Sequence, residues 1–422
     1  MRATIRPGIA RGTVAAPPSK SMAHRLLICA GLADGESTVK GVDPSEDILA
    51  TLDCLESLGA SVRREGGAVF LRGCNPRKSV PALLRCRESG STLRFMIPLC
   101  LLSGQPMRLE GSPTLLSRPL SVYESICRER GLRLEKQETA LLVEGTLTPG
   151  EYVLPGDISS QFVTGLLFAL PLLSGPSVLR LVPPVESRSY LNLTLAALRS
   201  AGIRLETPDE HTFVIPGDGV YRPGNTVVEG DYSNAAFFLA LNCIGGSVEV
   251  TGLDPGSLQG DRVCEQFFPL LRSGSPTLDI ADCPDLAPVL FTVAALCRGA
   301  VFTGTRRLRF KESDRGAAMA EEMAKFGFSL RLEENRITVP AGNPHAPDRP
   351  LSSHNDHRIA MALSLLCSRT GGEIEGAEAV RKSFPDYWSR LQSLGIPITL
   401  TEGPKVQGDR KALVAPAGAK LF

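Results

Sequence analysis

A unit that the chain repeats six times constrains the fold more than any other feature of the sequence. Each unit opens with a cluster of hydroxyl, amide or charged side chains, continues into a helix that is apolar on nearly all sides, and passes through a glycine into a strand. A helix without a polar face packs inside a protein rather than on its surface. The opening clusters are Ser19–Ser21, Glu88–Arg94, Asp157–Gln161, Asp231–Asn234, Asp282–Asp285 and His354–Arg358. This self-similarity predicts one βα-rich structural unit used six times.

The spacing of the units predicts two lobes. The first four units begin at nearly even intervals, whereas the fifth begins early. We expect the first three units, residues 18–229, to form what we call lobe two. Lobe one is expected to contain residues 230–422 together with residues 1–17, whose strand Arg2–Ile5 joins it. If the helix N-termini converge on the cleft between the lobes, their dipoles draw anions into it.

Composition argues against several classes of protein. The chain has 46 basic and 45 acidic residues, whereas a nucleic-acid-binding surface needs a basic excess. Its eleven cysteines contain no CxxC pair, so neither a disulfide framework nor a zinc site is indicated. The first ten residues lack the apolar region of a signal peptide, and no apolar stretch is long enough to cross a bilayer. We therefore expect a soluble cytoplasmic protein that acts on neither nucleic acid nor membrane.

The segment Pro17–Arg25 places two cations at the start of a buried helix. Its two prolines stop whatever precedes them, and Ser19 or Ser21 supplies a hydroxyl that can cap the helix. Lys20 and Arg25 then lie beside the unpaired N–H groups at the positive end of the helix, a combination that suits a phosphate. A capped surface helix with two solvated cations is the alternative interpretation.

The densest run of charge is Arg306–Arg315. A solvated basic strand end would explain it, but it follows the fifth helix and strand, where the other polar clusters gather. Lys311 and Glu312 are adjacent, and on extended backbone they point to opposite sides. One can then hold an anion while the other transfers a proton. Asp285, at a helix start, is a candidate general base, with a plain helix cap as the alternative.

Three further cations have ambiguous roles. Arg358 is interpreted as an anion clamp rather than part of a metal site, because His354 and His357 have no third ligand at a suggestive spacing. Arg118 precedes a proline and so lies on extended backbone. Arg118 and Lys382 can each be functional or merely solvated. No P-loop is present and no GxGxxG follows a strand, so nucleotide chemistry is unsupported.

Taken together, ten segments in order resemble the 5-enolpyruvylshikimate-3-phosphate synthase family (3-phosphoshikimate 1-carboxyvinyltransferases) along essentially the whole chain. They are PPSKSMAHR, ESGSTLRF, SRPL, SSQFVTGLL, SRSYLNLTL, VEGDYSNAAFFLA, PDLAPVLFTVAAL, RFKESDR, NDHRIAMALSLL and KSFPDYW. The resemblance implies an α/β fold of two closing lobes, each of three βαβαββ units, with buried helices converging on the cleft. It also implies transfer of the enolpyruvyl group of phosphoenolpyruvate to the 5-hydroxyl of shikimate 3-phosphate, with release of phosphate, in aromatic amino-acid biosynthesis. Neither a metal nor an organic cofactor is implied.

By position, the family motifs assign roles to residues of this chain. The implied shikimate 3-phosphate ligands are Lys20, Ser21, Arg25, Ser159, Ser160, Gln161, Ser187, Tyr190, Asp285 and Lys311. The implied phosphoenolpyruvate ligands are Lys20, Gly90, Arg118, Gln161, Arg315, Arg358 and Lys382. Asp285 and Glu312 match the proton-transfer pair, and Lys20 can share either task. Two carboxylates suit an addition followed by an elimination, because the two steps need opposite proton transfers.

The chain departs from the family pattern at three places, and at two of them a substrate contact is uncertain. Glu88 stands where the family often has Asn, so a side-chain contact to phosphoenolpyruvate there is in doubt. Arg307-Leu308 replaces the common Asn-Trp, which leaves a substrate contact from position 307 open. Arg188-Ser189 replaces Lys-Pro, a change we expect to be tolerated.

Three alternative functions fit the sequence less well. A relative that processes RNA ends and is built from similar units is disfavoured by the near-zero net charge. An enolpyruvyl transferase acting on UDP-N-acetylglucosamine carries a reactive Cys in the loop that here reads Ser112–Ser117. A repeat protein that binds phosphorylated metabolites without catalysis does not explain why Asp285 and Glu312 accompany the cations. The expected partners are therefore the two small-molecule substrates, bound by a monomer.

Overall fold

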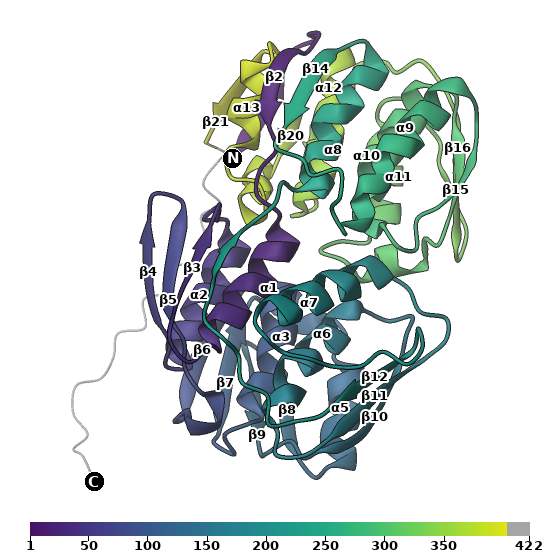
Figure 1. Ribbon diagram of the computed structural model, residues 1–422. Helices are drawn as coiled ribbons and strands as arrows, with labels where there is room; N and C mark the ends of the chain where they lie inside the picture. Colours follow the sequence, from purple (N-terminus) through teal and green to yellow (C-terminus); the bar gives the residue numbers. More distant parts are fainter. Residues whose placement is uncertain (403–422) are drawn as a thin grey trace, which may run out of the picture.

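Three mixed sheets with their helices form lobe two, the lower lobe in Figure 1. The computed structural model describes residues 1–402. The first sheet of lobe two contains β3 (Glu36–Lys40), β4 (Ser61–Glu65), β5 (Ala68–Arg72) and β13 (Asn225–Val227). The second contains β6 (Ala82–Arg87), β7 (Met107–Gly111), β8 (Arg133–Lys136) and β9 (Ala140–Glu144). The third contains β10 (Gly150–Pro155), β11 (Ser177–Val182) and β12 (Thr212–Ile215).

Lobe one, the upper lobe in Figure 1, also has three sheets. The first pairs β2 (Arg11–Ala15) with β14 (Ser247–Thr251). The second contains β15 (Thr277–Asp279), β16 (Ala300–Thr303), β17 (Arg331–Leu332) and β18 (Arg336–Val339). The third contains β1 (Arg2–Ile5), β19 (Leu351–Ser352), β20 (Gly372–Glu375) and β21 (Ile398–Thr401). The N-terminal strand β1 lies between β20 and β21 and is antiparallel to both.

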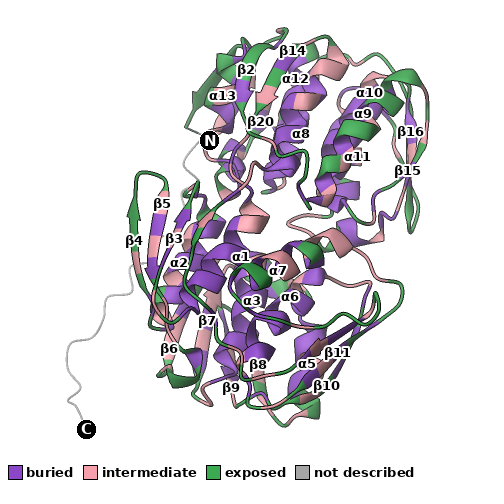
Figure 2. Cartoon of the chain, viewed as in Figure 1, coloured by how far each residue is buried: buried purple, intermediate pink, exposed green. Residues whose placement is uncertain are grey.

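One helix of each unit runs through the interior of its lobe, and Figure 2 shows these helices largely in the colour of buried residues. They are α1 (Lys20–Gly31), α3 (Gly90–Cys100), α6 (Ser160–Ala169), α8 (Tyr232–Leu241), α10 (Ala287–Leu296) and α12 (His357–Thr370). Each of the six sheets has one parallel strand pair, and α3, α6, α10 and α12 connect the strands of such pairs. Parallel neighbours require a crossover of this kind. The helices expected to be interior are therefore interior.

Half-buried helices cover the units from outside. They are α2 (Glu46–Ser57), α5 (Ser121–Glu129), α7 (Arg188–Ser200), α9 (Cys264–Ser273), α11 (Arg315–Ala324) and α13 (Tyr387–Ser393), with the short α4 (Pro113–Ser117) before α5. The order βαβαββ is complete in the units that contain β6–β9 and β15–β18. This arrangement agrees with the α/β fold expected from the repeat. None of the helices in residues 1–402 combines the length and the apolar character that crossing a membrane requires.

Each lobe has its own hydrophobic core. One cluster of buried apolar side chains lies between residues 23 and 228, and the other combines residues 3–14 with residues 232–398. Within residues 1–402 the chain passes between the lobes twice, from β2 to α1 and from β13 to α8. The two passages lie side by side, since Pro18 and Gly230 form an antiparallel bridge and Ser19 donates its backbone N–H to the carbonyl of Glu229. Helices α1 and α8 therefore begin at one hinge.

Candidate active site

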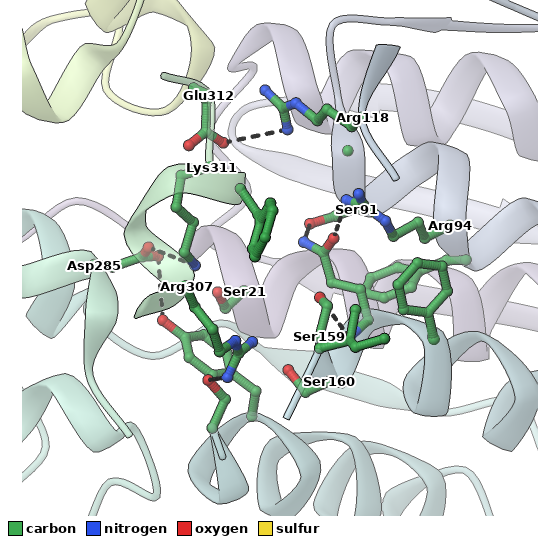
Figure 3. Close-up of a pocket in the computed structure, with 18 of the residues that line it drawn as sticks. Ser21, Ser91, Arg94, Arg118, Ser159, Ser160, Asp285, Arg307, Lys311 and Glu312 are labelled. Carbon is green, nitrogen blue, oxygen red and sulfur yellow. Dashed lines mark hydrogen bonds and ion pairs between the residues drawn. The ribbon is translucent and has the colours of Figure 1, made fainter. Parts of the chain in front are cut away.

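A pocket between the lobes brings together most of the predicted site residues (Figure 3). From lobe two, the charged and polar side chains that line it include Lys20, Ser21, Arg25, Asp47, Ser91, Arg94, Arg118, Ser159, Ser160, Gln161, Ser187 and Tyr190. Gly90 also lines it, and lobe one contributes Asp285, Arg307, Phe310, Lys311 and Glu312. Three predicted residues, Arg315, Arg358 and Lys382, do not line this pocket. Arg315 and Arg358 contact Asp285, which does, whereas Lys382 contacts Glu88 and Asn355, which do not.

The polar clusters that open the repeats cap the interior helices, as expected. In five of the six interior helices, a side-chain oxygen of the capping residue accepts a hydrogen bond from a backbone N–H of the first turn. The capping residues are Ser19, Ser89, Ser159, Asp231 and Asp356. Ser19 rather than Ser21 is thus the cap of α1. Asp285 caps no helix: it lies in the 3-10 turn η5 (Pro284–Leu286), whose capping residue is Cys283. The alternative that Asp285 is a plain helix cap is therefore wrong.

Lys20 is held as a cation at the first turn of α1. Its Nζ donates to Asp47 Oδ2 at 2.8 Å, and its backbone N–H donates to Asp231 Oδ2 at 3.0 Å. Burial alone would lower the pKa of Lys20, but the negative charges of Asp47 and Glu312 together outweigh burial and leave that pKa raised. Lys20 therefore acts as a fixed positive charge in the unliganded pocket.

Asp285 is surrounded by donors. Its Oδ1 accepts from Arg315 Nη1 at 2.6 Å and lies 3.1 Å from Lys311 Nζ. Its Oδ2 accepts from Arg358 Nη2 and from the hydroxyl of Tyr190, both at 3.1 Å. Burial opposes ionisation, but the three cations hold the pKa of Asp285 well below its usual range. Asp285 is thus an ionised hydrogen-bond acceptor, the state that a general base requires.

Glu312 is the second ionised carboxylate at the pocket. Its Oε2 accepts from Arg315 Nη2 at 2.6 Å, and its Oε1 lies 3.8 Å from Arg118 Nη1. Burial opposes ionisation here too, but Arg315 and then Arg118 hold the pKa of Glu312 well below its usual range. Arg315 is only 1% exposed and also donates from Nε to Asp356 Oδ2 at 2.9 Å, so one guanidinium joins both carboxylates to the start of α12.

The segment before Glu312 is a helical turn and not the solvated strand end of the alternative interpretation. Arg306–Phe310 forms a 3-10 helix, η6, and Lys311 after it has extended backbone, with φ −84° and ψ −158°. Even so, the two neighbouring side chains part as expected: Lys311 points to Asp285 and Glu312 to Arg118 (Figure 3). Burial lowers the pKa of Lys311, an effect that Asp285 partly offsets.

Arg25 joins two walls of the pocket. Its Nη1 donates to the carbonyl of Ser21 at 2.6 Å and its Nη2 to the carbonyl of Tyr190 at 3.0 Å. Its Nε donates to Thr194 Oγ1 at 2.9 Å, so helices α1 and α7 are held together by one guanidinium. Burial lowers the pKa of Arg25 to about 10, which still leaves the group charged at neutral pH.

Arg94 is a pocket cation that sequence reasoning missed. Its Nη1 donates to Gln161 Oε1 at 2.8 Å, while Gln161 Nε2 donates to Ser91 Oγ at 2.9 Å (Figure 3). Burial lowers the pKa of Arg94 to about 10. The only signal was a cation inside an otherwise apolar helix of the second repeat, where an unpaired charge would be costly. Gln161 is thereby fixed in orientation.

Gly90 allows a guanidinium to approach the start of α3. A Cβ at this position would lie 2.7 Å from Arg118 Nη1 and 3.1 Å from Arg94 Nη1. Arg118 has extended backbone, φ −64° and ψ 147°, as its following proline predicted. The absence of a side chain at Gly90 therefore sets where Arg118 can lie.

Lys382 lies outside the lining of the pocket and contacts one residue of each lobe. Its Nζ donates to the carbonyl of Asn355 at 2.6 Å and forms an ion pair with Glu88 across the cleft. The Asn355 amide also donates to Glu88, at 3.1 Å. The departure at position 88 thus places a carboxylate on a predicted phosphoenolpyruvate ligand.

Arg307 stands at the second departure from the family pattern, where the family often has Asn. It is buried, lines the pocket, donates from Nη1 to Ser187 Oγ at 2.7 Å, and lies 3.5 Å from Glu186 Oε2. Arg306 pairs with Asp157 at 3.0 Å across the same side of the cleft. Position 307 therefore gives the pocket a cation where the family often has an amide.

The histidines have separate environments. His357 is buried without a hydrogen bond to either ring nitrogen, and burial followed by the charges of Lys20 and Arg358 lowers its pKa well below the usual range. His354 Nε2 lies 3.0 Å from Glu322 Oε1, in a group with Glu321 that has the spacing of a metal site.

A lysine side chain lies where a metal ion would bind between Glu321, Glu322 and His354. Lys325 Nζ donates to both carboxylate oxygens of Glu322, at 2.9 and 2.8 Å. The group is therefore an ion-pair cluster that anchors the loop before α12.

Comparison with known proteins identifies the family. The model of the family EPSP synthase (3-phosphoshikimate 1-carboxyvinyltransferase) matches residues 6–267 and 272–391. The chain is 37% identical over 414 residues to the 3-phosphoshikimate 1-carboxyvinyltransferases of Clostridium kluyveri and of Clostridium perfringens strain 13, with 93% of this chain and 97% of each relative covered. This chain belongs to the EPSP synthase family. Its resemblance to that family in ten segments is thereby confirmed.

Solved structures agree on the fold. Two structures of EPSP synthase from Acinetobacter baumannii superpose with a TM-score of 0.77 each, covering 95% of this chain and 100% of theirs. Their sequence identities to this chain are 23% and 22%. The two-lobed α/β architecture of the EPSP synthase family is therefore that of this chain.

Proposed function

We propose that the interlobe pocket is where this chain, an enolpyruvyl transferase of aromatic amino-acid biosynthesis, transfers the enolpyruvyl group of phosphoenolpyruvate to the 5-hydroxyl of shikimate 3-phosphate. One observation carries the proposal. In a member of the EPSP synthase family, cations from both lobes converge on two ionised carboxylates, Asp285 and Glu312. The pocket lies within one chain, which supports a monomer as the working unit.

Charge balance supports these substrates. Together they bring two phosphates and two carboxylates, and the chain as a whole has a net charge of only +1. The pocket cations are paired with Asp47, Asp285 and Glu312 when no substrate is bound. Substrate anions would take over part of that pairing, in a cleft where exclusion of water strengthens each interaction.

We assign the ligands as the family motifs imply. For shikimate 3-phosphate they are Lys20, Ser21, Arg25, Ser159, Ser160, Gln161, Ser187, Tyr190, Asp285 and Lys311. For phosphoenolpyruvate they are Lys20, Gly90, Arg118, Gln161, Arg315, Arg358 and Lys382. The lining of the pocket supports all of them except Arg315, Arg358 and Lys382. For Arg315 and Arg358, support comes from their ion pairs with Asp285.

The carboxylates supply the proton chemistry. Asp285, ionised beside the predicted hydroxyl site, takes the proton of the attacking 5-hydroxyl. Glu312 must gain a proton before it can protonate the methylene of phosphoenolpyruvate. When the phosphate or carboxylate of that substrate neutralises Arg118 and Arg315, the pKa of Glu312 rises, because these cations are what depress it. In the elimination each carboxyl group works in the opposite sense: Glu312 takes a proton from the new methyl group, the bond from carbon to the phosphate oxygen breaks, and the proton held by Asp285 leaves with the phosphate.

The lobes are proposed to comprise residues 1–17 with 230–422 and residues 18–229. Support comes from the two separate cores and from the bridge between Pro18 and Gly230. Residues 403–422 of this assignment lie outside the described residues. All eleven cysteines are free thiols, which supports a reducing, cytoplasmic location.

The test is release of phosphate from phosphoenolpyruvate by the full chain. Turnover is expected with shikimate 3-phosphate and none with UDP-N-acetylglucosamine. Asp285→Asn should lower kcat by about 100-fold or more, the usual effect of losing an acid–base group, while the exposed control Asp348→Asn should not change it. Turnover with UDP-N-acetylglucosamine alone would favour the sister enzyme, and turnover with neither would favour a binding protein.

A further inference from the structure

Two carboxyl groups meet at the hydroxyl of Tyr190. The oxygen of that hydroxyl lies 3.1 Å from Asp285 Oδ2 and 3.3 Å from Asp261 Oδ2. Burial raises the pKa of Tyr190 well above its usual value, so the phenol keeps its single hydrogen. One hydrogen cannot serve two carboxylates at once. A second hydrogen must therefore reside on one of the two carboxyl groups.

The second hydrogen belongs on Asp261. Asp285 is bonded to three cations, as described above, and stays ionised. Asp261 lies in the 3-10 turn η4 (Gly260–Val263) and is 4% exposed, and among residues 1–402 no cation is hydrogen-bonded to it. Its Oδ1 is buried and accepts no hydrogen bond from that part of the chain. An ionised carboxylate in that position would be left without compensation.

The groups that face Asp261 favour the neutral carboxyl. After burial, the negative charge of Asp285 on η5 and then that of Asp231 before α8 raise its pKa. Arg358 on α12 and, less strongly, Ser233 on α8 oppose them, and the pKa of Asp261 is raised to about 7. Arg358 is itself bonded to Asp285. The remaining neighbours are Tyr190 on α7 and the thiols of Cys264 on α9 and Cys283 before η5.

We propose that Asp261 is a positioning residue whose protonated carboxyl donates to the Tyr190 oxygen and so directs the Tyr190 hydroxyl to Asp285. The donor order is Asp261 O–H to Tyr190, then Tyr190 O–H to Asp285 Oδ2. Tyr190 is also fixed through its carbonyl, which accepts from Arg25 Nη2 at 3.0 Å. Asp285 is thus held in one orientation toward the reacting hydroxyl. The inference rests on the proposed role of Asp285.

Loss of the Asp261 proton has a defined consequence. Two carboxylates then compete for one hydrogen, and the Tyr190 hydroxyl no longer points to Asp285 alone. The rate kcat should therefore fall as the pH rises through about 7, the region in which Asp261 titrates. In Asp261→Asn the amide N–H donates to Tyr190 at every pH, so this alkaline fall should disappear.

The experiment compares pH profiles of kcat for the full chain. We expect Asp261→Asn to match the wild type in acid and to lack its alkaline fall, with the exposed variant Asp348→Asn behaving as wild type. Tyr190→Phe should lower kcat about tenfold, the effect of one hydrogen bond. Adding Asp261→Asn to Tyr190→Phe should change nothing further. An unchanged alkaline fall in Asp261→Asn overturns the proposal.

A second measurement does not depend on turnover. The infrared difference spectrum between wild type and Asp261→Asn should contain the carbonyl stretch of a protonated carboxyl at pH 6, and this band should vanish as the pH is raised. A band of an ionised carboxylate at pH 6 overturns the proposal even in an active enzyme. Failure of the wild type to turn over, with the protonated band present, would instead count against the proposed function alone.

Discussion

The carboxylate of Asp231, at the start of α8 in lobe one, accepts a hydrogen bond of 3.0 Å from the backbone N–H of Lys20, the first residue of α1 in lobe two. Its other oxygen accepts from the N–H of Asn234 at 2.8 Å. One buried side chain therefore caps the first turns of two helices that belong to different lobes. Because Lys20 lines the pocket, the hinge and the site share this contact.

Asp231→Ala should affect both stability and activity. Loss of one helix cap costs about 1 kcal/mol, and Asp231 caps two helices. Urea unfolding should therefore show a larger loss of stability than in Asp314→Ala, which removes the single cap of α11. A raised KM for both substrates should accompany the first change only. Equal losses of stability in the two variants would contradict the double-cap interpretation.

The repeat and the caps were predictable because they are local. Hydrophobic periodicity and a preceding hydroxyl or carboxyl determine a helix within a few residues, so Ser89 and Ser159 could be placed at helix starts from sequence. The family motifs then identified side chains that meet only in the folded protein, such as Lys20 and Lys311. Their convergence follows from topology, which no local pattern encodes.

The missed residues act through contacts between distant segments. Asp47 pairs with Lys20 and Arg94 bonds Gln161, yet each looks like an ordinary charge on a helix. Asp261 is recognisable only once Tyr190 and Asp285 lie beside it. The 3-10 turn at Arg306–Phe310 is not predictable from the sequence, because the turn depends on tertiary packing rather than on periodicity.

Asp47→Asn should make substrate binding sensitive to pH. Without the Asp47 carboxylate, only Glu312 still opposes the effect of burial, so the pKa of Lys20 falls. Lys20 then loses its proton at a lower pH than in the wild type, and the KM for both substrates should rise earlier on the alkaline side. The KM measured across the pH range checks this. Asp53→Asn, which removes the partner of Arg87 on the same helix, should leave the profile unchanged.

Arg315→Met should weaken the protein and shift its acid unfolding. Arg315 is 1% exposed and forms ion pairs with Asp285, Glu312 and Asp356, so its removal takes a cation from each of the three carboxylates, and breaking a buried ion pair costs about 3–5 kcal/mol. A carboxylate whose folded-state pKa is depressed adds stability above its unfolded pKa, and this is lost as the pH falls through the folded value.

The Arg315→Met variant should unfold at a higher pH than the wild type when acid is added. Without Arg315, the depressed pKa values of Asp285 and Glu312 rise, so unfolding on acidification should begin at a higher pH than in the wild type. Circular dichroism followed during acid titration measures the midpoint. The exposed variant Arg309→Met should keep the wild-type midpoint, and an unchanged midpoint in Arg315→Met would disprove the expectation.

Gly90→Ala should weaken phosphoenolpyruvate binding. The new methyl would lie 2.7 Å from Arg118 Nη1, so the guanidinium must move. Displacement of a substrate-positioning group by an ångström can cost about 100-fold, and the KM for phosphoenolpyruvate should rise by about 10- to 100-fold. Gly274→Ala is the control, since no atom lies within 4 Å of its added methyl. An unchanged KM would show that the Arg118 guanidinium can move aside without weakening the binding of phosphoenolpyruvate.

Glu88→Gln should strengthen the interaction of Lys382 with phosphoenolpyruvate. In the unliganded protein the Glu88 carboxylate neutralises Lys382 across the cleft, and Lys382 and Asn355 in turn lower the pKa of Glu88. The Gln amide can still form hydrogen bonds at position 88 but has no charge. The substrate anion therefore no longer competes with a carboxylate for Lys382. The KM for phosphoenolpyruvate should fall several-fold at low salt and less at high salt, where screening weakens exposed pairs.

The same variant should loosen the unliganded closure of the lobes. The ion pair between Glu88 and Lys382 links lobe two to lobe one, and its removal should increase the radius of gyration measured by small-angle X-ray scattering without substrate. Both substrates together should restore the compact form, because their anions then bridge the lobes. Glu46→Gln, which removes a partner of Arg87 within lobe two, should change neither quantity. A KM that rises in Glu88→Gln would mean that the carboxylate positions Lys382 rather than competing for it.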